Sequence, residues 1–297
     1  MTSLYSWDNQ IPEGLKDPVL VVALDGWIDA GYGAAAAMGH LKMKIRTTRL
    51  VNFDTDELID HRARRPVMRL VNGLNESLKW PRLQLRHGRD ALGQDILVLT
   101  GPEPDFRWRG FVQAIVELAD HLGARMCVCF GAFPAPAPHT RPVTLGSTAS
   151  TRELADRVGF VDATFDIPAG AQAAIERGFA DAGKPAVGIW ARVPHYAATM
   201  PFPAASAAIL DCLTRLTGLV IDTDELHSRG RNAIAQIEQL VSNNPEHVEM
   251  VRSLEHQVDN ERAERTAAAQ ANPAFKVEDL PTGDELAAEL EKFLREQ

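Results

Sequence analysis

The stretch PVLVVALDGWIDAGYGAAAAM (residues 18–38) joins a continuously apolar run to an acidic turn and then to a segment of glycine and alanine. An apolar run without polar alternation is typical of a strand buried on both faces, and the alanines after it favour a helix. Further apolar runs lie at 47–53, 67–71, 82–87, 95–101, 125–133 and 186–193, and helical patterns lie at about 108–122, 169–182 and 206–216. This order predicts an α/β fold in which helices flank a mixed, centrally parallel sheet.

The composition is that of an ordinary globular protein, with 45% hydrophobic and 24% charged residues in a chain of 297. No apolar run approaches the ~20 residues that span a bilayer, and the first residues, MTSLYSWDNQ, lack the features of a signal peptide. We therefore expect a cytoplasmic protein without membrane contact. Three cysteines without a CxxC motif argue against a disulfide framework or a thiolate metal site, and we expect all three to be buried: Cys127, Cys129 and Cys212.

The net charge of −9 is concentrated near the C-terminus, where residues 222–297 hold 17 acidic and 8 basic side chains. The chain has no general basic surface for nucleic acid, so no nucleic-acid partner is expected. One local basic cluster, DHRARRP, contains Arg62, Arg64 and Arg65. It can be a solvated face paired with nearby acids of the chain, or it can contact a subunit or a phosphate.

Changes in sequence texture divide the chain into three predicted parts. Residues 1–221 carry the strand and helix patterns of the α/β core, and 222–268 form a helical pair at about 229–242 and 245–268. We expect this pair to pack outside the core and to contribute to a homo-oligomer. Residues 269–297 are predicted to be a linker followed by a short acidic amphipathic helix, DELAAELEKFLRE.

The glycines after the first strand resemble a dinucleotide-binding fingerprint, since Gly31, Gly33 and Ala36 match G-x-G-x-x-G/A. In that fingerprint the first glycine follows the strand directly, whereas six residues, DGWIDA, intervene here. Asp25 and Asp29 would also place negative charge beside a pyrophosphate. The pattern favours packing instead, with small residues letting the helix approach the sheet and Asp29 lying at the helix start.

Two loops are candidate binding sites because each follows an apolar strand, where open α/β sheets bind ligands. The second loop, GAFPAPAPHTRPVTLGSTAS (131–150), is stiffened by prolines, and its His, Thr and Arg could hold an anion with donors from GSTAS. Alternatively, it is a packed surface loop with solvated side chains. We expect both loops to border one cleft; the candidate residues are Asp25, Gly26, Trp27, Asp29, His139, Thr140 and Arg141. No nucleophile elbow, HExxH motif or P-loop is present, so we assign no catalytic residue, metal or cofactor.

Four ordered motifs together resemble one family: DGWIDAGYGAA, VNFDTDELIDHRARRP, DFRWRGFVQAIVELADHLG and the 131–150 loop. They are similar to the proteasome assembly chaperone 2 family in its actinobacterial form, over roughly residues 4–265. The resemblance implies an α/β fold like that of nucleoside phosphorylases and, for eukaryotic and archaeal relatives, help in assembling the 20S proteasome without catalysis. Some relatives end in a hydrophobic residue, a Tyr and a final residue that dock in a proteasome pocket, whereas this chain ends Arg295, Glu296, Gln297.

Two hypotheses of function follow. The first is a non-enzymatic binding or assembly protein, a homo-oligomer whose partners include proteasome subunits. Aromatic and Arg side chains dominate interface energies, so its interface candidates are Arg62, Arg64, Arg65 and Trp108. The alternative is an enzyme or sensor that binds a small anionic or nucleoside-like ligand at the two loops.

Overall fold

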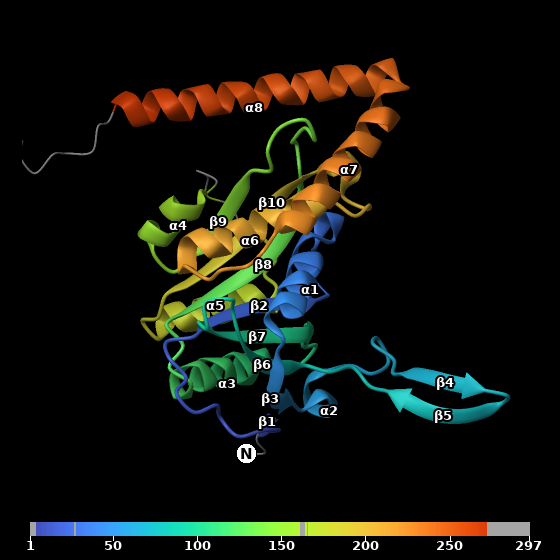
Figure 1. Ribbon diagram of the computed structural model, residues 1–297, viewed down its shortest axis with the longest axis vertical. Helices are drawn as coiled ribbons and strands as arrows, with labels where there is room; N and C mark the ends of the chain where they lie inside the picture. The colour runs from blue at the N-terminus through green and yellow to red at the C-terminus, as the bar shows by residue number, and fades with distance from the viewer. Residues whose placement is uncertain (1–3, 27, 161–163, 165, 272–297) are drawn as a thin grey trace, which may run out of the picture.

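The computed structural model describes residues 4–26, 28–160, 164 and 166–271. Within them, one large sheet runs through the molecule in the order β1-β3-β6-β7-β2-β8-β10-β9 (Figure 1). Its strands are β1 Tyr5–Trp7, β2 Val19–Asp25, β3 Thr48–Phe53, β6 Gln84–Arg89, β7 Asp95–Pro102, β8 Met126–Ala135, β9 Leu145–Ala149 and β10 Ala186–Pro194.

The middle of the sheet is parallel and both edges are antiparallel. β2 pairs in parallel with β7 and β8, and β8 pairs in parallel with β10. At one edge β1, β3 and β6 are antiparallel, and at the other β9 runs antiparallel to β10. This arrangement confirms the predicted mixed, centrally parallel α/β sheet.

The strand β9 corrects one expectation from the sequence. The sequence predicts GSTAS to be part of a binding loop, whereas in the structure Leu145–Ala149 pairs with β10, placing Thr148 opposite Gly188. The segment is therefore a strand, and because it is the edge strand, alternate backbone N–H groups pair with β10 while the others face away from the sheet.

Helices cover both faces of the sheet. The helices α1 (Gly33–Ile45) and α6 (Pro203–Thr217) lie on one face, and α3 (Trp108–His121) and α5 (Ala171–Asp181) lie on the other. Shorter elements connect them: α2 Thr55–Leu58, α4 Arg152–Val158, and the 3₁₀ turns η1 Ala30–Tyr32 and η2 His195–Ala197.

Successive side chains of the central strands point to opposite faces of the sheet, so the core forms two layers. Val19 and Val21 of β2 pack with residues of α1 and α6, whereas Leu20 and Val22 pack with residues of α3 and α5. All four side chains are almost fully buried, as a strand covered on both faces requires. The three cysteines are free and buried, as the sequence predicted.

The glycines at the start of α1 allow close packing. A Cβ on Gly33 would lie 2.9 Å from the Cβ of Ala132 in β8 and 3.2 Å from that of Ala205 in α6. Gly31 has a φ of +63°, and a Cβ there would lie 2.7 Å from that of Phe202. These positions support the packing interpretation of the glycine pattern.

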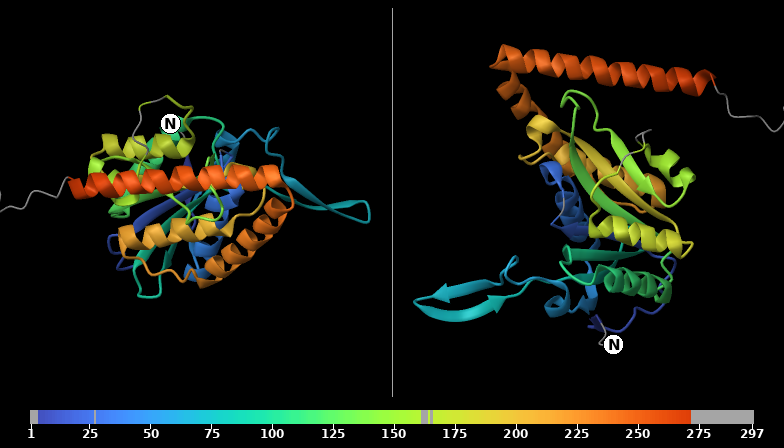
Figure 2. Two further views of the ribbon diagram at one scale, coloured as in Figure 1. Left: turned by 90° about the horizontal axis from the view of Figure 1, so that it is seen from above. Right: turned by 180° about the vertical axis from the view of Figure 1, so that it is seen from behind.

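A β-hairpin stands apart from the main sheet. Its strands, β4 (Val67–Val71) and β5 (Leu74–Lys79), pair only with each other and project from the body (Figures 1 and 2). Asn72 and Gly73 form its turn, both with positive φ. The predicted strand at 67–71 therefore exists, but it lies outside the sheet.

Two helices follow the core, α7 (Asp224–Ser242) and α8 (Pro245–Ala271). α7 packs against α6, and α8 turns back across the top of the molecule (Figure 2). The sequence predicts the linker and acidic helix at 269–297; residues 269–271 belong to α8, and the rest lies outside the described residues. In the part of the chain that the structure describes, no helix has the length and apolarity needed to cross a membrane.

Candidate functional site

Both candidate loops begin at the same end of the central strands. β2 and β8 are parallel neighbours, so the loops after them leave from adjacent carboxyl ends. Beyond the paired region, Asp29 and Ala132 form an isolated parallel bridge that joins the first loop to β8. Trp27, at the centre of the first loop, lies outside the described residues.

Asp29 holds the start of α1. Its Oδ1 accepts a hydrogen bond from the Ala34 N–H at 2.8 Å, and its Oδ2 accepts one from the Ala35 N–H at 2.9 Å. Burial raises the pKa of Asp29, although these bonds act in the opposite direction. Both carboxylate oxygens thus serve the helix N-terminus, in agreement with the capping role expected from the sequence.

Asp25, the last residue of β2, lies in a small charged cluster at the same end of the central strands. Burial raises the pKa of its carboxyl, the negative charge of Asp29 raises it further, and Lys42 and Arg64 oppose this rise. Gly26 leaves room for the Arg64 guanidinium, whose Nη2 would lie only 2.7 Å from a Cβ at that position. Arg64 also pairs with Asp105. Arg64, one of the arginines expected at an interface, therefore forms its contacts within its own chain.

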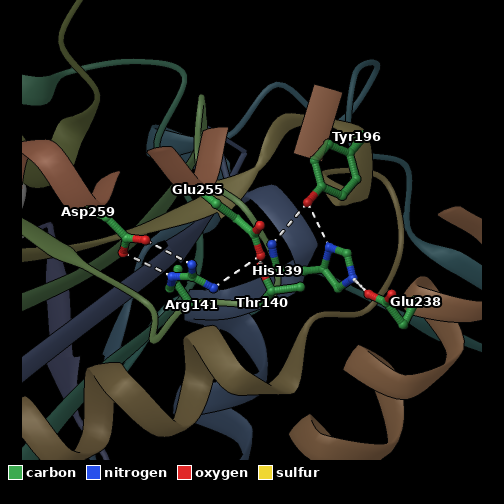
Figure 3. Close-up of polar contacts among 7 residues, drawn as sticks. All are labelled: His139, Thr140, Arg141, Tyr196, Glu238, Glu255 and Asp259. Atoms are coloured by element: carbon green, nitrogen blue, oxygen red, sulfur yellow. Dashed lines mark hydrogen bonds and ion pairs between the residues drawn. The ribbon is translucent and has the colours of Figure 1, made fainter. Parts of the chain in front are cut away.

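His139 contacts side chains from two other elements (Figure 3). Its imidazole is fully buried, with Nδ1 2.8 Å from the Tyr196 hydroxyl and Nε2 2.8 Å from Glu238 Oε2 on α7. The Tyr196 oxygen also accepts the His139 backbone N–H at 2.9 Å. In the tautomer that carries its proton on Nε2, this proton is donated to Glu238 and the Tyr196 hydroxyl donates to Nδ1.

Thr140 and Arg141 bind carboxylates of α8 (Figure 3). The Thr140 hydroxyl donates to Glu255, and Arg141 Nη1 donates to the same carboxylate at 3.0 Å. The Arg141 guanidinium also makes two parallel bonds to Asp259. The sequence predicted an anion site here, and the anions that these residues bind are carboxylates of the chain itself.

The predicted residues of the two loops lie at the same end of the central strands but have different partners. Asp25 and Asp29 face the start of α1 and Arg64, whereas His139 and Arg141 face α7 and α8. Beneath α8, Arg141, Phe202 and Val258 line a cavity of about 10 Å³, which is room for one water molecule. A nucleoside-like ligand does not fit in that space.

The remaining interface candidates lie near the hairpin end of the molecule or at the start of α3. Arg62 and Arg65 are exposed, just before β4. Trp108 is half-buried at the first residue of α3, where its indole N–H donates to the Pro104 carbonyl at 2.6 Å. That bond gives Trp108 a structural role in fixing the loop before α3.

Sequence reasoning missed a buried carboxyl on α5. Glu176 is 7% exposed, and burial raises its pKa to about 7. The Thr148 hydroxyl donates to its Oε2 at 2.6 Å, while Oε1 has no partner among the described residues. A Cβ on Gly188 would lie 2.5 Å from Oε1, so the glycine makes room for the carboxyl. A single glutamate on a helix gives no sequence signal for this.

No metal site accompanies these groups in the described part of the chain, where no three His, Cys, Asp or Glu side chains are placed to hold an ion. The PAC2 family model matches residues 23–241. The chain belongs to the PAC2 family. The resemblance seen in the four motifs is thereby confirmed.

Solved structures of actinobacterial proteins share the PAC2 fold with this chain. A Corynebacterium glutamicum protein of unknown function is 30% identical with a TM-score of 0.80, covering 87% of this chain and 98% of its own. A Mycobacterium tuberculosis protein of unknown function is 32% identical with a TM-score of 0.80, covering 88% and 92%. A proteasome-assembly chaperone homologue from the same organism is 31% identical with a TM-score of 0.73, covering 78% and 99%. A comparison with curated protein sequences finds no match.

Proposed function

We propose that this PAC2 protein is a non-enzymatic binding and assembly protein that acts in the cytoplasm as a homo-oligomer and has proteasome subunits as partners. Its similarity to the Mycobacterium tuberculosis proteasome-assembly chaperone homologue supports the choice of partner. The contacts of the second loop weigh against the small-ligand alternative, because His139, Thr140 and Arg141 are engaged by Tyr196, α7 and α8.

The exposed hairpin is the observation that carries this proposal. Val67 is 68% exposed, Leu70 59% and Leu74 70%. An isolated two-stranded hairpin is marginally stable in water, and here both faces expose apolar side chains, since Leu70 pairs with Asn75 and Leu74 with Val71 in the next pair along. Exposed apolar surface of this kind marks a protein contact. A permanent contact of this kind is most simply made with a second copy of the chain, since most soluble oligomers are homo-oligomers.

Residues at the base of the hairpin extend the same surface. Arg62 and Arg65 are exposed and form no ion pair with another described residue, and Trp80 is 47% exposed directly after β5. Arg and Trp are the side chains most enriched at interface hot spots. We call this the hairpin surface: Arg62, Arg65, Val67, Leu70, Leu74 and Trp80.

Light scattering and subunit binding test the proposal together. We would measure the mass of the assembly and its binding to proteasome subunits of the same organism for the wild type and for a Leu70→Ser, Leu74→Ser variant. Loss of one interface anchor typically costs about 2 kcal/mol, or about thirtyfold in affinity. We therefore expect the variant to dissociate at concentrations where the wild type is assembled.

Leu92→Ser is the matched control, because Leu92 is 73% exposed in the turn between β6 and β7, away from the hairpin surface. Its mass and binding should equal those of the wild type. A wild type that is monomeric and binds no proteasome subunit would overturn the proposal, whatever the variants do.

A further inference from the structure

An open groove lies between α6, α7 and the segment before β9. Its volume is about 350 Å³. Its floor is apolar, formed by Pro142, Val143, Leu145, Ala204, Ala208 and Ile234. It adjoins the small cavity beneath α8, and Arg141, Pro142 and Val143 border both.

The rim of the groove is positively charged. Arg215 and Arg231 line it, both exposed, and no carboxylate of the described residues forms an ion pair with either. The acid that lines the groove, Asp211, is 2.9 Å from His227 and also accepts the Thr223 hydroxyl. A guanidinium stays charged at any physiological pH. An apolar floor beside two uncompensated cations suits an acidic, amphipathic segment.

The chain carries such a segment beyond α8. In DELAAELEKFLRE (284–296) four large apolar residues follow at helical spacing: Leu286, Leu290, Phe293 and Leu294. Its acids occupy the other positions: Asp284, Glu285, Glu289, Glu291 and Glu296. We propose that residues 284–296 dock in this groove of their own chain as an acidic amphipathic helix.

The connection has a suitable length. Arg141 lines the groove and binds Asp259 on α8, and α8 continues from there to Ala271. Those twelve residues of helix span about 18 Å. The twelve residues 272–283 can reach up to about 40 Å, more than twice that length. This reach is long enough for residues 284–296 to return to the groove of the same chain.

Docking makes the C-terminal segment an intramolecular competitor. Tethering gives it an effective concentration in the millimolar range, so it covers the groove until an acidic partner of higher affinity displaces it. The contact depends on charge, and it should therefore weaken at high salt. This inference does not depend on the identity of the protein's assembly partner.

Cysteine labelling of the full-length chain tests the docking. The native cysteines are buried, so a maleimide reports on one introduced at Ala208, in the groove. Ala233→Cys is the matched control, because Ala233 is also half-buried but lines a different cavity on α7. A segment docked for about nine-tenths of the time slows labelling about tenfold.

Charge reversal makes the test specific. We expect labelling at Ala208→Cys to accelerate about tenfold when Arg215 and Arg231 are changed to Glu, or when Glu285, Glu289 and Glu291 are changed to Lys. Combining both sets should restore protection, and Ala233→Cys should label at one rate throughout. Equal labelling in all variants would overturn the proposal. So would protection that disappears on dilution, because that result would place the segment on a second copy.

Discussion

Arg141 and Asp259 lie 118 residues apart in the sequence and form a two-point ion pair, with Nε–Oδ1 at 2.9 Å and Nη2–Oδ2 at 2.8 Å. The planar guanidinium fork fixes the direction of the carboxylate as well as its distance. Hydrogen bonding to Arg141 also holds the pKa of Asp259 below its usual value. This pair, together with Glu255, sets the position of α8 over the second loop.

Replacing Arg141 should loosen α8. In Arg141→Ala we expect faster amide exchange in α8 and faster proteolysis there, because both carboxylate partners lose their cation. Arg141→Lys should have an intermediate effect, since a lysine keeps the charge but cannot make the fork. Hydrogen exchange by mass spectrometry checks this. The control is Arg177→Ala, which breaks an exposed pair with Asp181 inside α5; equal exchange of α8 in both Ala variants would contradict the role of Arg141.

A larger residue at Gly33 should destabilise the core. A Cβ there would lie 2.9 Å from that of Ala132, closer than two carbons can approach, so Gly33→Val must push α1 away from β8. Overpacking of this kind costs about 1–3 kcal/mol. Urea denaturation measures the loss.

Gly39 in the same helix provides the opposite case. A Cβ at Gly39 meets no atom within 4 Å, so Gly39→Ala should leave the packing unchanged. The substitution should stabilise the fold by about 0.5–1 kcal/mol, because alanine restricts the unfolded chain. A stability loss in Gly39→Ala equal to that in Gly33→Val would contradict the role of close packing at Gly33, because a Cβ at Gly39 meets no other atom.

The centre of the fold was predictable because its strands are buried on both faces. VLVVAL and ILVL read as continuous apolar runs, and they became β2 and β7 in the parallel part of the sheet. The strand β9 was missed because LGSTA is small and polar, and its pairing depends on β10, nearly forty residues later. Of the hairpin, β4 was predicted and β5 was not, because LNESLK shows no alternation of apolar and polar residues and packs against no core.

The candidate site shows the same difference between local and long-range information. The capping role of Asp29 is local, because its partners are five and six residues away, and the sequence indicated it. The partners of His139 and Arg141 lie 99 and 118 residues away on α7 and α8. No local spacing encodes such contacts, so the residues suggested an external anion where the fold supplies carboxylates of its own.

Glu176 should make the stability of the protein depend on pH. Its folded pKa is raised from 4.5 to about 7 by burial, so between these values the folded state binds more protons than the unfolded state. The free energy of unfolding should therefore fall as the pH rises from 4.5 to 7, by on the order of 3 kcal/mol from this group, and then remain level. Glu176→Gln has no charge to bury and should remove that contribution, while its carbonyl still accepts the Thr148 hydroxyl.

Urea denaturation at pH 5, 6, 7 and 8 compares the two proteins. Thr148→Val is the control, because it removes the hydrogen bond to the carboxylate and should steepen the fall. Parallel curves for the wild type and Glu176→Gln would mean that Glu176 ionises in the folded protein without a penalty.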